Sequence, residues 1–248
     1  MDEIDEKKPK LLLLPNVLAD VKYHHLFLPA AVDKAVATLD GLIAESAGGG
    51  RRFLGRFQTK KPAIDIPLAL LNTHTQDHEI DFLLAPILKG ERWGLISDAG
   101  LPCIADPGSK LVQRAKTVGI AVQAFVGPSS IFLSLMLSGL PGQRFNFLGY
   151  LGKEEKTRGS DIVKVEQRSK IDLSTQIFIE SPHRNAHTLQ TLLQRLNDAT
   201  RLCVAWDLTL PTQGVVSQTI GQWKKSQSPN LDKKAAIYLV FSGGITQE

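Results

Sequence analysis

The chain has 248 residues, of which 43% are hydrophobic and 22% charged, a balance typical of one large or two ordinary globular domains. Its net charge of +4 permits an anionic partner such as RNA but is too small to require one. Cys103 and Cys203 form no CxxC pair, which argues against a disulfide framework and fits a reducing cytosol. Leu11–Leu14 is too short for a signal core or a membrane span, so we expect a cytoplasmic protein without membrane contact.

Short apolar runs alternate with helical patterns along the first part of the chain. In chain order they predict a strand at 11–14, a helix at 29–44 (whose last three residues also fit a strand), a helix at 77–88, a strand at 93–96, a helix at 109–118, a strand at 120–125 and a helix at 130–137. The glycine run 48–50 breaks this pattern and indicates a mobile hinge. Pro86 is expected to kink or end its helix.

A polar segment with nearly alternating charges, 149–170, marks a shift in composition. The pattern then resumes with a strand at 175–179, a helix at 185–197 and strands at 202–206 and 235–241. This order predicts an α/β fold of two α/β domains with mainly parallel or mixed sheets, residues 1–145 and 146–248. Ligands of parallel sheets collect at the carboxyl ends of the strands.

Two turns rich in small residues follow predicted strands at such ends. In Asp98-Ala99-Gly100-Leu101-Pro102, Gly100 can take a positive φ, and Asp98 can accept hydrogen bonds from a ribose or an ammonium group. A plain strand-to-helix loop explains the same pattern equally well. Asp106 is expected to cap the helix that follows.

The second turn, Val126-Gly127-Pro128-Ser129-Ser130, stands before another predicted helix. A serine at this place can cap the helix, and the free amide groups of the first turn can bind a ligand. These two roles are compatible with each other.

Together these turns resemble the tetrapyrrole methylase family, the class III S-adenosylmethionine-dependent methyltransferases, and within it the ribosomal RNA small-subunit 2′-O-methyltransferases. The matching blocks, in order, are 97–108, 126–130, 144–151, 177–184 and 205–209, so the resemblance covers roughly residues 93 to 241. The N-terminal third departs from the family pattern: Leu14–Asp20 lacks the usual glycine, and Glu45 is kept in an otherwise changed segment.

The resemblance implies that S-adenosylmethionine is the cofactor and that it binds in a cleft between the two domains. The implied cofactor-binding residues are Asp98, Gly100, Leu101, Ser129, Ser130, Ile131, Ile179, Asp207, Leu208, Ala235 and Ala236. It also implies a homodimer and an enzyme that uses no metal. His74, Asp77 and His78 have the spacing of metal ligands, but no third strong ligand stands near them.

Methyl transfer to a hydroxyl requires alignment of the reactants and removal of a proton. Glu180 and Glu45 are the candidate catalytic bases. For Glu180 an equally good role is to orient Arg184 or His183.

The most basic stretch is a candidate RNA contact, because its cations alternate with Phe53 and Phe57, which could stack on bases. Its cations are Arg51, Arg52, Arg56, Lys60 and Lys61. A helix with a solvated basic face is the alternative. The sequence therefore predicts a methyltransferase acting on ribosomal RNA or a ribosomal subunit. A methyltransferase for a porphyrinoid or another small molecule, and a non-catalytic cofactor-binding or RNA-binding relative, stay open as alternatives.

Overall fold

The computed structural model describes residues 10–21 and 23–244. The chain divides into two compact units, with the division between Ser129 and Ser130. The boundary expected from the sequence, between residues 145 and 146, falls inside strand β6 of the second unit.

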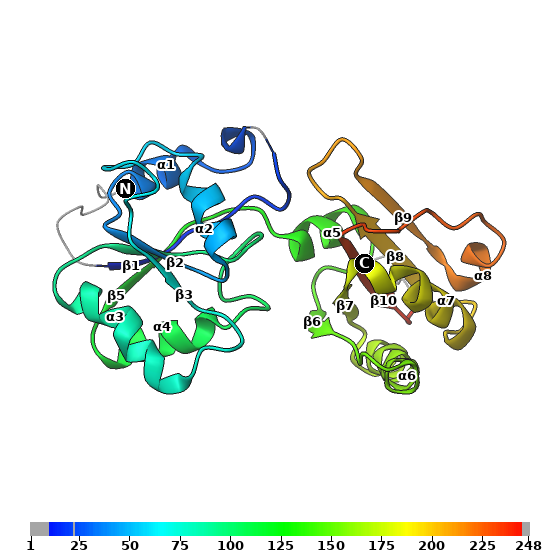
Figure 1. Cartoon of the computed structure of the whole chain (residues 1–248). Helices are drawn as coiled ribbons and strands as arrows, with labels where there is room; N and C mark the ends of the chain where they lie inside the picture. The colour runs from blue at the N-terminus through cyan, green and yellow to red at the C-terminus, as the bar shows by residue number, and fades with distance from the viewer. Residues whose placement is uncertain (1–9, 22, 245–248) are drawn as a thin grey trace. The chain divides into compact units, whose positions relative to one another are not determined.

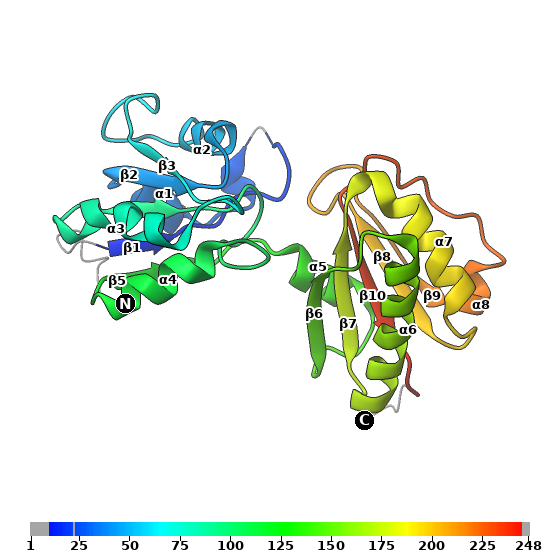
Figure 2. The same ribbon diagram turned by 60° about the horizontal axis from the view of Figure 1, so that its bottom comes forward.

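The first unit is a parallel five-stranded sheet with helices on both faces (Figure 1). The strand order is β3-β2-β4-β1-β5. Helices α1 and α2 pack on one face, and α3 and α4 pack on the other (Figures 1 and 2). The elements are β1 (Lys10–Leu13), η1 (His24–Leu26), α1 (Ala30–Val36), β2 (Gly41–Ala44), α2 (Ala47–Leu54), β3 (Leu68–Leu70), η2 (Asp77–Glu79), α3 (Ile80–Leu88), β4 (Trp93–Leu95), α4 (Gly108–Thr117) and β5 (Ala121–Ala124).

The apolar run in β1 follows from the helices on both faces of this sheet. Successive side chains of a strand point to opposite faces. Leu12 packs among residues of α1 and α2, and Leu11 packs among residues of α3 and α4. Both side chains are fully buried, so both positions must be apolar.

Three expectations for this unit are corrected or decided by the structure. The helix expected at 29–44 ends at Val36, and Leu42–Ala44 belongs to β2, as the alternative had it. The glycine run 48–50 is no hinge, because it lies inside α2. Pro86 does not end its helix, since α3 continues to Leu88.

Helix α2 contains glycines because neighbouring residues approach its backbone too closely for side chains. Ser46 caps the helix by accepting a hydrogen bond from the Gly49 amide at 3.0 Å. A Cβ at Gly50 would lie 2.6 Å from Cδ1 of Leu68, so a side chain there would push α2 off β3. Phe53 and Leu54 are fully buried and fix the other end of the helix in the core.

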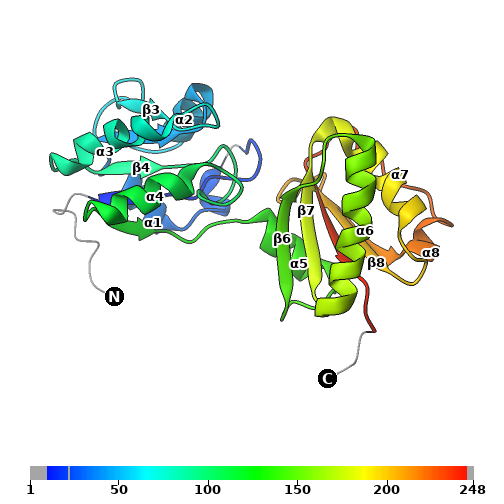
Figure 3. The same ribbon diagram turned by 90° about the horizontal axis from the view of Figure 1, so that it is seen from below.

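The second unit is a mixed sheet in the order β6-β7-β10-β8-β9, in which only β6 and β7 run parallel. Helices α6, α7 and α8 share a core with one face, and α5 packs against β8, β9 and β10 (Figures 2 and 3). The elements are α5 (Ser130–Ser138), β6 (Phe145–Tyr150), α6 (Glu155–Asp172), β7 (Thr175–Glu180), η3 (Pro182–Arg184), α7 (Asn185–Arg195), β8 (Arg201–Trp206), β9 (Gly214–Thr219), α8 (Ile220–Trp223) and β10 (Ala236–Phe241). In the part of the chain that the structure describes, no helix is long and apolar enough to cross a membrane.

Candidate functional site

Asn16 fastens the loop after β1 to the loop after β4. Its buried side chain donates hydrogen bonds to the carbonyl oxygens of Ser97 (3.0 Å) and Asp98 (3.1 Å). Its backbone amide donates to the carbonyl oxygen of Gly100 at 2.8 Å. The turn that carries Asp98 is therefore held at the carboxyl ends of two neighbouring strands.

Glu45, directly after β2, supports the same turn from the other side. Its Oε1 accepts hydrogen bonds from the Ser97 hydroxyl at 2.5 Å and from the Asp98 amide at 2.9 Å. Its Oε2 has no hydrogen bond to any residue that the structure describes. One carboxylate oxygen of Glu45 thus positions the turn, and the other remains free.

Asp98 itself is exposed and lies against the first turn of α2. Its Oδ1 accepts a hydrogen bond from the Ser46 hydroxyl at 3.0 Å. A Cβ at Gly49 would stand 2.1 Å from this oxygen, so only glycine leaves the carboxylate in place. Oδ2 is free of hydrogen bonds within the described residues and is available to a ligand.

Glycines also bring the loop after β5 close to this turn. Gly100 has φ +73°, and a Cβ there would lie 3.4 Å from the carbonyl oxygen of Pro128. A Cβ at Gly127 would lie 2.1 Å from Cβ of Pro15. The loops after β4, β1 and β5, three neighbouring strands, therefore converge at the carboxyl end of the sheet.

Asp106 serves the turn structurally, as the sequence predicts. It accepts hydrogen bonds from the amides of Gly108 (2.7 Å), the first residue of α4, and of Cys103 (3.0 Å). Burial raises the pKa of the Asp106 carboxyl above its ordinary value, and the charge of Glu45 raises it further. Ser129 is buried in the first unit, while Ser130 and Ile131 begin α5 in the second.

In the second unit, the strand register gathers the remaining predicted residues at one end of the sheet. Ala236 is opposite Glu180 on one side and Trp206 on the other. Because β10 runs antiparallel to β7 and β8, its start lies beside their carboxyl ends. The predicted residues at this end are Ile179, Glu180, Asp207, Leu208, Ala235 and Ala236.

Glu180 is buried, and both of its carboxylate oxygens are engaged. Oε1 accepts hydrogen bonds from the Ser181 amide at 2.6 Å and from Arg184 Nε at 2.8 Å and Nη2 at 2.5 Å. Oε2 accepts one from the Thr188 hydroxyl at 2.8 Å. This geometry favours the second of the two roles considered for Glu180, the orientation of Arg184.

Asp207 sits at the end of β8 in a left-handed conformation, with φ +49°. Its amide donates to the Ala235 carbonyl oxygen at 3.1 Å, and its Oδ2 accepts hydrogen bonds from Thr212 (2.8 Å) and from the Lys234 ammonium. These bonds join the β8 end to the β10 start.

The basic stretch divides into cations with internal partners and cations that face solvent. Arg51 donates to the carbonyl oxygens of Ala63 and Ile66 at 2.6 and 2.8 Å, and Lys60 pairs with Asp40 at 3.0 Å. Arg52 and Lys61 are exposed and make no ion pair within the described residues.

Base stacking on the phenylalanines of this stretch is ruled out. Phe53 is fully buried, and Phe57 packs against the His24 ring at a centroid distance of 4.3 Å. The signal was misleading because alternation of cations and phenylalanines on a helix also arises when the aromatic side faces the core.

A pocket of about 110 Å³ joins the basic stretch to the Asp98 turn. Its lining includes Arg52 and Arg56 of the basic stretch, Gly49 of α2, Asn16 and Asp98. Cationic side chains thus stand directly beside the strand ends described above.

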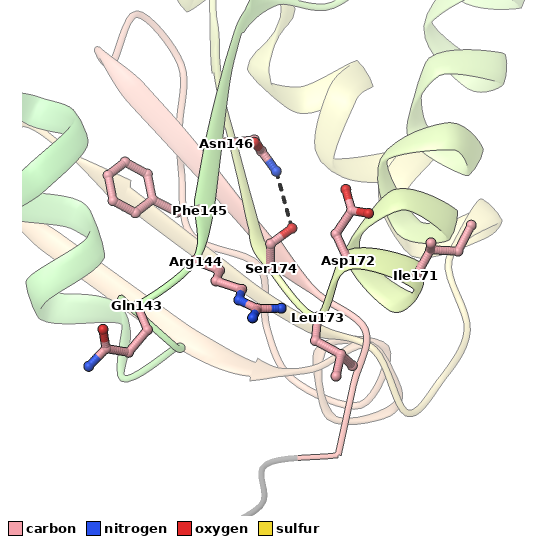
Figure 4. A pocket seen from close by; sticks show the side chains of 8 residues that line it. All are labelled: Gln143, Arg144, Phe145, Asn146, Ile171, Asp172, Leu173 and Ser174. Carbon is pink, nitrogen blue, oxygen red and sulfur yellow. Dashed lines mark hydrogen bonds between the residues drawn. The ribbon is translucent and has the colours of Figure 1, made fainter.

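A larger hollow, of about 590 Å³, lies elsewhere in the second unit (Figure 4). It is lined by Arg144 and Asn146 at the start of β6 and by Asp172 and Ser174 before β7. These are the amino ends of two parallel strands, opposite the end that carries Glu180. The hollow is therefore separate from the predicted site.

Comparison with known proteins establishes the family. The sequence model of the tetrapyrrole (corrin/porphyrin) methylases matches residues 29–224. The chain belongs to this family. It is accordingly a methyltransferase whose methyl donor is S-adenosylmethionine.

Curated relatives carry a more specific name. A protein of Xylella fastidiosa named ribosomal RNA small subunit methyltransferase I is 30% identical over 85% of this chain and 74% of its own length. A protein of the same name from Escherichia coli O157:H7 is 30% identical over 98% of this chain and 81% of its own length. One from Thermotoga maritima is 29% identical over 78% of this chain and 84% of its own length.

Solved structures show the same fold at low sequence identity. The methyltransferase CobJ superposes with a TM-score of 0.63 at 13% identity, covering 94% of this chain and 93% of its own. The cobalamin biosynthetic enzyme cobalt precorrin-4 methyltransferase superposes with a TM-score of 0.58 at 13% identity, covering 94% of each chain.

The residues of the first unit fit S-adenosylmethionine. An exposed carboxylate oxygen, Oδ2 of Asp98, matches the hydroxyl or ammonium groups that such a molecule presents. Gly100 carries no Cβ and holds a positive φ, so the ligand can approach the backbone closely. Both features sit on a turn that Asn16 and Glu45 hold in position.

Sequence reasoning missed three supports of the site. Asn16, Thr188 and Lys234 hold Asp98, Glu180 and Asp207 respectively. Only Asn16 carried a sequence signal, as the polar residue of a turn that follows a buried strand. The other two are ordinary helix and loop residues until the chain folds.

Proposed function

We propose that this protein transfers a methyl group from S-adenosylmethionine to a ribose 2′-hydroxyl of small-subunit ribosomal RNA. The names of its relatives support small-subunit ribosomal RNA as the substrate, and the sequence resemblance described above supports the 2′-hydroxyl as the acceptor. The observation that carries the proposal is the pocket that Arg52 and Arg56 share with Asn16 and Asp98. Cations beside the strand ends favour an acceptor flanked by phosphates, and such a substrate places the protein in the cytoplasm.

The two arginines of this pocket differ in how well a phosphate group can reach them. Arg52 is exposed and has no hydrogen-bond partner within the described residues. Arg56 pairs at 3.1 Å with Asp20, whose side chain is 86% exposed. The Arg56 side chain is itself only 14% exposed, so Arg56 supports the pocket, and Arg52 is the arginine that a phosphate reaches directly. Lys61 extends this basic surface, Arg51 holds the loop 63–66 beneath it, and Lys60 forms a surface ion pair with Asp40.

Methyl transfer needs an aligned nucleophile and an acceptor for its proton. S-adenosylmethionine supplies a methyl group already activated on a positively charged sulfur. The proposed proton acceptor is Glu45, because its Oε2 is free whereas both oxygens of Glu180 are engaged. In the first unit, Asp98 and Gly100 are the proposed contacts of the cofactor. Glu180 positions Arg184.

A homodimer is the proposed assembly. Helix α5 exposes Phe132, Met136 and Leu137, of which Met136 is 77% exposed. Phe132 and Met136 are one helical turn apart and share a face. Sedimentation of Met136→Glu should give a monomer; a dimer with unchanged association would overturn this assignment.

The test of the proposed function is transfer of a tritiated methyl group to three acceptors in parallel: small-subunit ribosomal RNA, intact small ribosomal subunits and a porphyrinoid. Labelling of RNA or subunits supports the proposal, and labelling of the porphyrinoid alone overturns it. Arg52→Gln should raise the KM for RNA about tenfold, the loss of one phosphate contact. Arg144→Gln is the matched control, because it removes an exposed arginine of the second unit that does not line this pocket.

A further inference from the structure

A second basic surface lies on the other unit, between α6 and the end of α7. A groove of about 460 Å³ runs along α6, and Arg195, the last residue of α7, closes one side of it. The two helices pack side by side (Figures 2 and 3). Its polar and small lining residues are Lys156, Gly159, Ser160, Lys164, Gln167 and Arg195. No Asp or Glu lines this groove, here called the α6 groove.

Three of the four acidic residues of α6 have partners, and the fourth, Glu155, is exposed beside Lys156 in the chain. Glu166 is buried and accepts hydrogen bonds from the Asn197 amide at 2.8 Å and from the Thr200 hydroxyl. Asp172 pairs with Arg168 at 3.4 Å. Asp161 accepts a bond from the Gly152 amide at 3.1 Å. The cations of the groove therefore have acidic neighbours on their own helix, Glu155 and Asp161, but neither carboxylate lines the groove itself.

The cations of the groove face solvent. Lys156 and Arg195 are exposed and form no ion pair with any residue in 10–21 or 23–244. Lys164 approaches Asp161 only to 3.5 Å, and its side chain is 70% exposed. An exposed pair at this distance is worth little and yields readily to another anion.

Gly159 shapes the floor of the groove. A Cβ at this position would lie 3.8 Å from Nε of Arg195, so the guanidinium rests on the helix surface. Glycine in a helix interior costs about 1 kcal/mol relative to alanine. Because Gly159 has no side chain and that of Ser160 is small, the groove is open between the longer cationic side chains that flank it.

We propose that the α6 groove binds the phosphodiester backbone of the RNA substrate, at a place outside the methyl-transfer site. This rests on the proposed function only in taking RNA as the partner. Lys156 and Lys164 are eight residues apart, about 12 Å along a helix. Helix α6 follows β6, so Lys156 stands near the strand ends that carry Glu180, and the groove leads away from them.

The test compares RNA binding by two triple variants of the full chain. The groove variant combines Lys156→Gln, Lys164→Gln and Arg195→Gln. The charge-matched control combines Lys89→Gln, Lys116→Gln and Lys225→Gln, three exposed lysines outside the groove. Filter binding to small-subunit ribosomal RNA is measured across a salt series, with S-adenosylhomocysteine binding as a check on folding.

The groove variant should bind this RNA about tenfold to a hundredfold more weakly at 0.1 M salt, with a salt slope smaller by about 2 to 3. The control should bind like the wild type, and cofactor affinity should not change in either variant. An equal loss of RNA affinity in both variants, or no loss in the groove variant, overturns the proposal. If the groove variant keeps both its RNA affinity and its methyl transfer, the groove's partner is instead an acidic protein. Absence of RNA methylation by the wild type instead contradicts the proposed function, and the binding comparison still decides the groove.

Discussion

Replacing Gly49 with alanine places a methyl group where the Asp98 carboxylate now sits. The new Cβ would lie 2.1 Å from Oδ1 of Asp98 and 2.8 Å from the Ser46 hydroxyl oxygen that caps α2. Both are too close for a carbon atom, so the carboxylate must turn away and the cap must shift. Gly48 is the neighbouring control: a Cβ there meets only the flexible end of Arg52, at 3.3 Å.

The two substitutions should change stability in opposite directions. Gly48→Ala gains about 0.5 to 1 kcal/mol of unfolding free energy, because alanine favours the helix. Gly49→Ala has the same gain but disturbs a cap worth about 1 kcal/mol and the hydrogen bond between Ser46 and Asp98. Its net result should be a loss of about 1 kcal/mol.

Cofactor binding should separate the two variants further. Loss of a hydrogen bond to a charged group costs about 1.5 to 3 kcal/mol, which weakens binding roughly tenfold to 150-fold. Titration calorimetry with S-adenosylhomocysteine should show this loss for Gly49→Ala and wild-type affinity for Gly48→Ala. Equal affinities, with equal stabilities in urea, would refute both the clash and the placement of Asp98 at the cofactor.

Three further predictions concern buried acids and thiols. Glu180→Gln should lower the unfolding free energy by about 2–3 kcal/mol in urea, because it leaves the partly buried Arg184 unpaired; lost turnover with full stability would instead make Glu180 a catalytic base. Burial, and to a smaller extent the charge of Glu45, raises the pKa of Asp106. This carboxyl therefore holds its proton more tightly in the folded protein than in the unfolded chain. Wild-type stability should therefore fall, relative to Asp106→Asn, as pH rises from about 4 through the raised pKa; parallel pH profiles would contradict this. Burial raises the pKa of the Cys103 thiol to about 11, so about 0.1% is thiolate at pH 8 and iodoacetamide should label native protein slowly; alkylation at the rate of a free thiol would exclude it.

Several parts of this protein follow from local sequence. The apolar run at 11–14 and the turn at 98–102 indicate a buried strand and a strand-end loop, and both are found where expected. Asp106 accepts a hydrogen bond from the amide of Gly108, the first residue of α4, although the N-cap residue itself is Pro107. These features depend on neighbouring residues, whose effect on backbone conformation is short-ranged.

Other parts depended on packing that local patterns do not report. The glycines of α2 resemble a hinge in the sequence, yet Leu68 and Asp98 approach from other segments and leave no room for side chains. Helix α6 was not predicted within the polar segment 149–170, because Glu166 and Arg158, which are polar, occupy buried positions. Strand β9 was also missed, since its pairing with β8 provides the order that its own residues do not.

The sequence by itself determined the family, the order of the strand-end turns and the residues they carry. Only the tertiary structure decided how those residues are used. One carboxylate oxygen of Glu45 supports the Asp98 turn and the other is free, whereas Glu180 accepts hydrogen bonds from Arg184. The physical reason is that a carboxylate's role depends on the donors around it. Those donors come from residues far away in the chain for Glu45 and Asp98, and folding alone brings them together.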